Sequence, residues 1–391
     1  MVTIETGVRY QGRPSKEEMA RRHALAVAFM KERGLDYLVM QANEGVMCEK
    51  VRWFCEIRSV HYTYVLFDKE GALSMISHGA EGGKALGWDV GLTNNIAVPV
   101  FNNAAYGDSF AADKAVGIMK KTGCEKIGFL NLNLITTGFY LGLLKGLPGA
   151  EALDVTDEFD YLVAVKSDEE LRMLEEACVM HDRAAEAIPA LLYAGRLERE
   201  FGADLYRLAV LMAADEYLPN IAVGSSKMQG PMYNLHFQNK IIEAGDVLNI
   251  LFEVPTITGY YSDLHRYYSM GSPAPEMLEV HEGAEKLQDY IASLCKPGVK
   301  SCDIFAESNR WLKDNGFAPE VRLCGHGQGY GLVERPYFDA YDQMILKENM
   351  YLAIHATVGK GNASVCPSDN YVVTKEGAKR MTGYRRGLIR V

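Results

Sequence analysis

The chain has 391 residues, of which 48% are apolar and 24% charged, and its formal net charge is −10 at pH 7. This length suits two domains with separate cores, because single cores stop growing near roughly 250–300 residues. Nucleic acid is excluded as a partner, since phosphate binding needs clustered Lys and Arg and this acidic chain has only Arg-Arg and Lys-Lys pairs. We expect a small-molecule substrate.

No segment predicts export or membrane insertion. The N-terminal segment lacks a basic stretch followed by an unbroken apolar one. No apolar run reaches the roughly 18 residues that span a bilayer. The eight cysteines form no CxxC pair and no spacing typical of a disulfide scaffold. We therefore expect a cytoplasmic protein with reduced thiols and no membrane partner.

In the first part of the chain, helical patterns alternate with short apolar runs. A helical pattern opens after Ser15 and closes at Gly34. Runs typical of strands lie at 36–41, 62–67, 73–77 and 126–130. The two middle runs flank a turn and predict a hairpin. Together these elements predict an α/β domain over residues 1–160.

The pattern changes at Ser167, which forms a capping box with Glu170 ahead of a long amphipathic helix. A second helix, a strand-rich stretch from about 219 to 270, two more helices and a final group of strands follow. This order predicts an α+β domain over residues 161–391.

One strand-rich stretch, 247–271, carries groups suited to chemistry. It predicts two strands joined near Gly259. Because side chains alternate across a strand, Tyr261, Asp263 and His265 share one face. A rigid element would then hold an acid and an imidazole two residues apart. The alternative is a half-exposed strand with a surface Asp/His pair.

A second stretch, GHGQGYG at 325–331, is rich in glycine. Its glycines permit close approach of the backbone to a ligand, and His326 stands among them. Glu334 and Arg335 follow. The stretch lacks the strand–turn–helix setting of a dinucleotide motif. A glycine-rich loop with one structural histidine is the alternative.

Taken together, these segments resemble the superfamily of creatinase, prolidase, aminopeptidase P and methionine aminopeptidase, whose catalytic domain has the pita-bread fold. The resemblance covers essentially the whole chain, since the first domain is similar to the creatinase and prolidase N-terminal domain. Its anchors are VAVKSDEELRMLEEA, EAGDVLNILF, GYYSDLHR, HGQGYGLVERP, LKENMYLAI and YVVTKEGAKRMTG. The implied fold is an α/β N-terminal domain followed by an α+β pita-bread catalytic domain.

The resemblance also implies where metal ions would bind. Metal-dependent members use Asp, Asp, His, Glu and Glu, the first Asp eleven residues before the second. The matching positions here hold Phe252, Asp263, His326, His355 and Ser368. These groups offer a charge of about −1 where the family set offers about −4, so two divalent ions would not be neutralised. We therefore expect no metal, as in creatinase, whose GYYTALER segment is similar to GYYSDLHR.

A single ion is the alternative. Asp263, His326 and His355 form a set of two histidines and one carboxylate, the type that holds one Fe(II) or Zn(II) with open positions.

The metal-free interpretation assigns proton transfer to His236, near the position of the family's catalytic histidine, because an imidazole with a pKa near 6.5 suits that task. Asp263 would orient water or a cationic substrate. The predicted catalytic residues are His236, Asp263, His265, His326, His355 and Glu334.

The predicted substrate-binding residues are Arg58, His61, Phe252, Tyr261 and Arg335. Creatinase sends an aromatic residue and an arginine into its partner's active site from the segment that corresponds to residues 53–67. Arg58 is a candidate to bind a carboxylate there, because its planar fork engages carboxylates in a bidentate way. The alternatives are a surface position for Arg58 and a simple ion pair for Arg335.

The resemblance implies a metal-independent, creatinase-like hydrolase or lyase that cleaves a C–N bond of a small polar or zwitterionic metabolite, in a homodimer. One alternative is a single-metal (Fe or Zn) hydrolase or lyase that diverged from the Xaa-Pro peptidases. The other is a non-catalytic, peptidase-like binding module.

Overall fold

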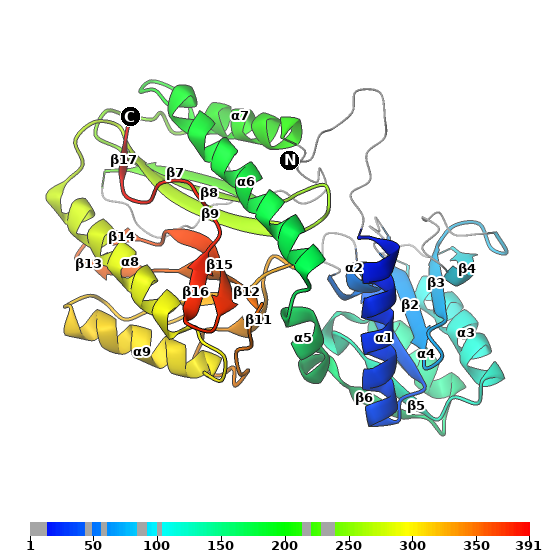
Figure 1. The fold of residues 1–391 in the computed structure, drawn as a ribbon. Helices are drawn as coiled ribbons and strands as arrows, with labels where there is room; N and C mark the ends of the chain where they lie inside the picture. The colour runs from blue at the N-terminus through cyan, green and yellow to red at the C-terminus, as the bar shows by residue number, and fades with distance from the viewer. Residues whose placement is uncertain are drawn as a thin grey trace. The chain divides into compact units, whose positions relative to one another are not determined.

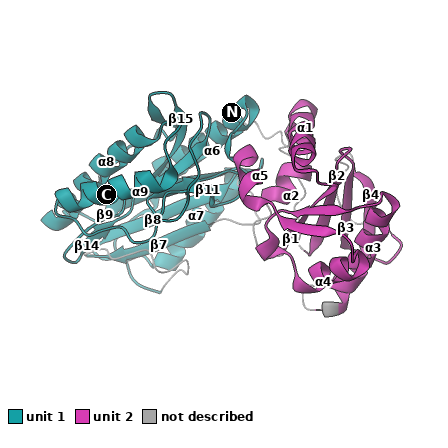
Figure 2. Cartoon of the chain, turned by 90° about the horizontal axis from the view of Figure 1, so that it is seen from below, with its two compact units in different colours: residues 1–12, 164–391 teal, residues 13–163 magenta. Residues whose placement is uncertain are grey.

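The computed structural model describes residues 14–43, 49–55, 61–83, 92–99, 104–212, 220–227 and 239–391. The chain divides into two compact units. One is Arg13–Val163, and the other contains Ala164–Val391 (Figure 2). None of the helices in the described part of the chain is long and apolar enough to cross a membrane.

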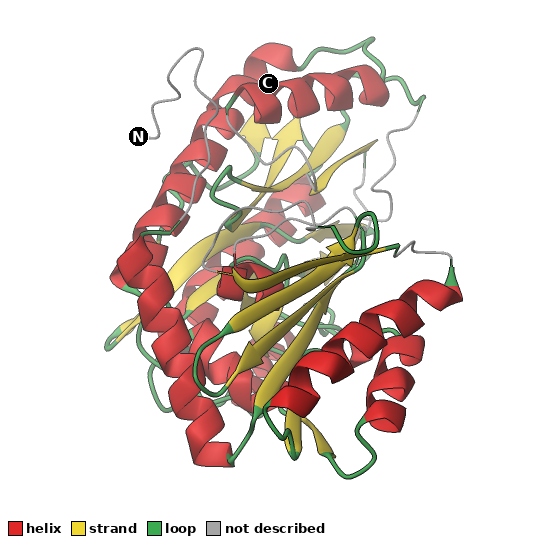
Figure 3. Ribbon diagram, turned by 90° about the vertical axis from the view of Figure 1, so that its right-hand side faces the viewer, coloured by secondary structure: helices red, strands yellow, loops and turns green. Residues whose placement is uncertain are grey.

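The first unit is an α/β domain, as predicted. Its six-stranded sheet has the order β4-β3-β2-β1-β5-β6. The strands are β1 (Tyr37–Ala42), β2 (Thr63–Asp68), β3 (Leu73–His78), β4 (Leu92–Val98), β5 (Lys126–Phe129) and β6 (Glu151–Asp154). The helices are α1 (Lys16–Arg33), α2 (Glu49–Cys55), α3 (Ala105–Lys121), α4 (Thr137–Gly146) and α5 (Thr156–Ala164), with a 3₁₀ turn at Leu132–Leu134. Helices flank both sides of the sheet (Figure 3).

Strand alternation gives this sheet two apolar faces. On β2, the ring of Tyr64 stacks on Phe139 of α4 with a centroid distance of 4.0 Å. Phe67 lies on the other face, 4.9 Å from Phe54 of α2. The predicted hairpin is confirmed, because β2 and β3 pair antiparallel. The predicted first helix is also confirmed: Ser15 Oγ accepts from the backbone N–H of Glu18, and the helix ends at a left-handed residue, Gly34.

The second unit is built on a nine-stranded sheet, in which β11-β10-β12-β15-β9-β8-β7 follow one another, β16 pairs with β15, and β17 pairs with β9. Its main strands are β7 (Asn220–Ser226), β8 (Val247–Pro255), β9 (Tyr261–Ser269), β10 (Gly325–Gly327), β11 (Glu334–Tyr337), β12 (Tyr351–His355) and β15 (Ser368–Thr374). Two short edge strands, β16 (Gly377–Arg380) and β17 (Ile389–Arg390), complete it, and β13 (Val358–Lys360) pairs separately with β14 (Ala363–Val365).

The four helices of this unit in the described residues are α6 (Asp168–Leu191), α7 (Glu198–Leu211), α8 (Pro275–Leu294) and α9 (Ser301–Asp314) (Figure 1). Helix α6 begins with the predicted capping box of Ser167 and Glu170. Side chains from α6, α7 and one face of β8 and β9 form a shared hydrophobic core, in which Phe252 is 1% exposed. The other face of these two strands is therefore left for polar groups.

A buried ion pair fixes the glycine-rich loop of this unit. Lys166 Nζ lies 2.9 Å from Glu334 Oε2, and both side chains are almost wholly buried. The backbone N–H of Gly331 donates to the other carboxylate oxygen. A Cβ at Gly329 would lie within 2.7 Å of the lysine nitrogen and both carboxylate oxygens, so a side chain there would displace the ion pair.

We predict that Lys166→Met lowers the free energy of unfolding by about 3–5 kcal/mol, because it leaves the Glu334 carboxylate buried without this cation. The matched control is Lys360→Met, which breaks the half-exposed pair of Lys360 and Glu279 and is expected to cost less than about 1 kcal/mol. Urea denaturation measures both. Equal losses in the two variants would contradict the prediction.

Candidate metal centre

Asp263 lies in the middle of β9, and the pairing with β8 decides what stands beside it. The antiparallel register places Asp263 opposite Glu253, and Leu264 opposite Phe252. Directly paired residues project to the same side of a sheet. Asp263 and Glu253 therefore share one face, and Phe252 points to the other, where its ring packs edge-on against His181.

Two imidazoles lie close to Asp263, His326 from β10 and His355 from the end of β12, two strands that pair with each other. His355 Nε2 lies 3.1 Å from Asp263 Oδ2 and 3.1 Å from His326 Nε2. All three side chains are buried. Among the residues that the structure describes, they form the one group of His, Cys, Asp and Glu side chains whose ligand atoms all lie within 4.8 Å of one another.

Hydrogen bonds orient this cluster. His326 Nδ1 lies 2.8 Å from the carbonyl oxygen of Gly327. A carbonyl only accepts, so Nδ1 carries the proton and the lone pair of Nε2 faces the cluster. Ser368 Oγ donates to Asp263 Oδ1, and the backbone N–H of Asp263 donates to Asn370 Oδ1. Asp263 Oδ2 and the Nε2 atoms of His326 and His355 therefore face one another.

The charges of Asp263, His326 and His355 shift one another's pKa values. Burial alone would raise the pKa of Asp263, but the charge and hydrogen bond of His355, with the hydrogen bond of Ser368, hold that pKa below its usual range. Burial opposes protonation of His355, yet attraction to Asp263 outweighs it and raises the pKa of His355 to about 10. Burial, and then the charge of His355, lower the pKa of His326 to about 3. Without a metal, a proton on His355 thus balances Asp263.

These donors fit one divalent ion. One carboxylate oxygen and two imidazole nitrogens converge in a buried position, and the second nitrogen of His326 is anchored by a backbone carbonyl, as is usual for metal-binding histidines. They do not fit two ions. Phe252 lies in the apolar core, and the hydroxyl of Ser368 is committed to Asp263.

Glu253 is the residue that the sequence analysis missed. Its Oε1 accepts from Gln328 Nε2 at 2.8 Å, and its Oε2 accepts from Asn220 Nδ2 at 2.9 Å. Burial and the negative charge of Asp263 raise its pKa well above the usual value. The sequence signal that could have found it is the even or odd spacing from Asp263. In this hairpin a residue ten positions before Asp263 shares its face of the sheet, whereas a residue eleven positions before it does not.

Other predicted site residues have different partners. On β9, two residues along from Asp263, the Nε2 atom of His265 forms a hydrogen bond with Asn249 Oδ1. The backbone N–H of Tyr261 donates to the carbonyl oxygen of Gly329. Glu334 pairs with Lys166, and Arg335 pairs with Asp342. These last two side chains are thus engaged in ion pairs within the fold.

Three of the predicted site residues are not among the described residues of this cluster. His236 and Arg58 lie outside the described residues. His61 belongs to the first unit, where its ring lies 4.5 Å from that of His78.

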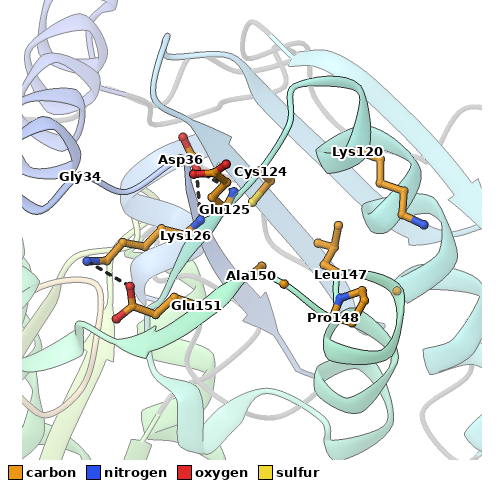
Figure 4. A pocket seen from close by; sticks show the side chains of 12 residues that line it. Gly34, Asp36, Lys120, Cys124, Glu125, Lys126, Leu147, Pro148, Ala150 and Glu151 are labelled. Atoms are coloured by element: carbon orange, nitrogen blue, oxygen red, sulfur yellow. Dashed lines mark hydrogen bonds and ion pairs between the residues drawn. The ribbon is translucent and has the colours of Figure 1, made fainter.

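The first unit also has a hollow of about 720 Å³ beside the start of β5 (Figure 4). Asp36 there accepts from the backbone N–H groups of Glu125 and Lys126 and pairs with Lys69, while the Lys126 side chain lies 3.4 Å from Glu151. Most of the charge in this hollow is therefore already balanced.

Fold and site together define a two-domain protein whose second domain carries a candidate metal centre. Residues 172–375 match the model of metallopeptidase family M24, and the chain belongs to this family. It is 26% identical over 238 residues to the Xaa-Pro dipeptidase of Pyrococcus furiosus, which covers 60% of this chain and 68% of that protein.

Solved structures of similar fold include the X-Pro aminopeptidase of Thermotoga maritima, with a TM-score of 0.78 and 17% identity over 94% of this chain and 99% of that one. Dipeptidase PepE of Mycobacterium ulcerans also has a TM-score of 0.78, with 23% identity over 97% of this chain and 100% of that one. These likenesses confirm the predicted fold, an α/β domain followed by a pita-bread domain.

Family membership confirms the prediction of a hydrolase acting on C–N bonds. The expectation of no metal was wrong, because the family is one of metallopeptidases and Asp263, His326 and His355 form a cluster able to hold an ion. The charge argument failed because it assumed two ions. It excluded a pair of ions but not a single one.

We predict that chelator-treated protein loses stability as the pH rises from about 6.5 towards 10. The pKa of an unfolded histidine is about 6.5, and that of His355 in the fold is about 10. The ion pair with Asp263 therefore stabilises the fold fully below about pH 6.5 and is lost as the pH rises through about 10. Urea denaturation at a series of pH values measures this slope. His355→Gln should flatten it, whereas His78→Gln should not, and an unchanged slope in His355→Gln would contradict the assignment.

Proposed function

We propose that the protein is a single-metal dipeptidase of the Xaa-Pro type, with the ion held by Asp263, His326 and His355. The observation that carries the proposal is the convergence of their three ligand atoms in a buried site. The name of the Pyrococcus furiosus relative, Xaa-Pro dipeptidase, supports the substrate class.

A divalent ion in this site would supply Lewis-acid polarisation of the scissile carbonyl. Three protein ligands would leave coordination positions open, as catalytic sites require. Ser368 and Asn370 hold Asp263 so that Oδ2 faces the two imidazoles. The carbonyl of Gly327 keeps the proton of His326 on Nδ1, away from the cluster.

We assign proton transfer to Glu253. It stands directly opposite Asp263 on the same face of the sheet, and burial and the negative charge of Asp263 raise its pKa well above the usual value, which favours the protonated carboxyl group. Such a group can give a proton to the leaving nitrogen of a cleaved peptide bond. The amides of Gln328 and Asn220 fix its two oxygens.

The proposal predicts about one equivalent of metal per chain and hydrolysis of Ala-Pro in preference to Ala-Ala. Asp263→Asn and His326→Gln should each weaken metal binding and lower kcat/KM by more than about 100-fold, because removing a ligand costs more than removing its outer partner. Elemental analysis and a dipeptide assay measure these effects.

His281→Gln is the control, because this buried histidine lies outside the cluster and should leave the metal content unchanged. Metal retained at full occupancy by both ligand variants, or a loaded protein that cleaves no dipeptide, would contradict the proposal.

Glu253→Gln separates proton transfer from metal binding. We expect kcat to fall by about 10²–10⁴-fold, the range typical of a lost general acid or base, with metal content unchanged. Glu253→Asp, which keeps the carboxyl group, should recover part of the activity. Loss of the ion in Glu253→Gln would show instead that this carboxyl group is a ligand.

A further inference from the structure

A second hollow, of about 470 Å³, lies in the catalytic unit between the end of α8 and the hairpin of β15 and β16. Its lining includes three cationic side chains, Lys379, Arg380 and Arg386, and two carboxylates, Asp289 and Glu376. Tyr371 also lines it. Its volume lies in the range of small-molecule sites.

Two hydrogen-bond donors in this wall have no protein partner among the described residues. Tyr371 is 2% exposed, and its hydroxyl group makes no hydrogen bond. Arg380 Nε is also buried and unbonded. Tyr371 stands directly opposite Arg380 in the β15–β16 pairing, so both side chains project to the same side. Unsatisfied buried donors are rare in folded proteins and point to a bound partner.

The lining carries three cationic side chains against two carboxylates, which favours an anion as that partner. Arg386 is already neutralised, because its guanidinium group lies 2.6 and 3.1 Å from the two oxygens of Asp289. Arg380 donates from Nη2 to the carboxylate of Asp369 and to the carbonyl oxygen of Tyr384. Its Nε–H group therefore remains available to a ligand. Burial raises the pKa of Tyr371, so the hydroxyl group stays protonated and able to donate.

We propose that this hollow binds a small oxyanion, a carboxylate or a phosphate, between the hydroxyl group of Tyr371 and the Nε edge of Arg380. A phenol and a guanidinium group present donors to one oxyanion, and a charge-assisted hydrogen bond from arginine is the stronger of the two. The site is separate from the reaction proposed above and does not depend on it.

Isothermal titration with inorganic phosphate and, separately, with acetate tests the proposal on full-length, chelator-treated protein. At least one anion should bind saturably, and the anion that binds identifies the chemistry. Tyr371→Phe removes only an unbonded hydroxyl group, so it should fold normally, keep dipeptidase activity and bind the anion at least about tenfold more weakly.

Arg380→Lys, which keeps the charge but loses the Nε edge, should also bind more weakly. The control is Arg310→Gln, an exposed arginine of α9 that should bind like the parent. Absence of saturable binding of either anion to the parent, or equal affinity in the parent and Tyr371→Phe, would overturn the proposal. Because these measurements need no metal and no substrate, their failure would leave the proposed dipeptidase activity untouched.

Discussion

The catalytic unit depends on how the buried carboxylate of Asp263 is neutralised. An isolated charge in such a place would cost far more free energy than a domain can supply. The fold meets this cost with a hydroxyl donor, Ser368, and with the imidazole of His355. The positive charge can come from a proton on His355 or from a metal ion, and the two compete for the same lone pair.

Strand alternation separates two kinds of chemistry on β15. Ser368 and Asn370 point towards Asp263 and form hydrogen bonds with it. Asp369 and Tyr371, one residue out of phase, point away: Asp369 binds Arg266 and Arg380, and Tyr371 lines the hollow beside α8. One strand thereby serves a catalytic face and an arginine-rich face, because its side chains alternate.

Much of the fold followed from local rules in the sequence. The caps at Ser15 and Ser167 and the hairpin of β2 and β3 are set by neighbouring residues, so their patterns predicted them correctly. The sequence also named Asp263, His326 and His355 together. It missed Glu253, because register depends on the length of the hairpin, and a difference of one residue moves a side chain to the other face.

Long-range pairing was beyond such reasoning. The sequence placed Glu334 after a glycine-rich loop but could not show its ion-pair partner, Lys166, which lies 168 residues away in the chain. Only the folded chain brings these two charges together. The cofactor was misjudged for a related reason: counting charges over five positions tests a pair of ions, whereas three converging atoms suffice for one.

Anomalous X-ray diffraction from crystals of metal-loaded protein, recorded above the absorption edge of the bound metal, tests the central claim most directly. A single peak among Asp263 Oδ2, His326 Nε2 and His355 Nε2 is the predicted result. Two neighbouring peaks, or no peak at these three atoms, would contradict the account.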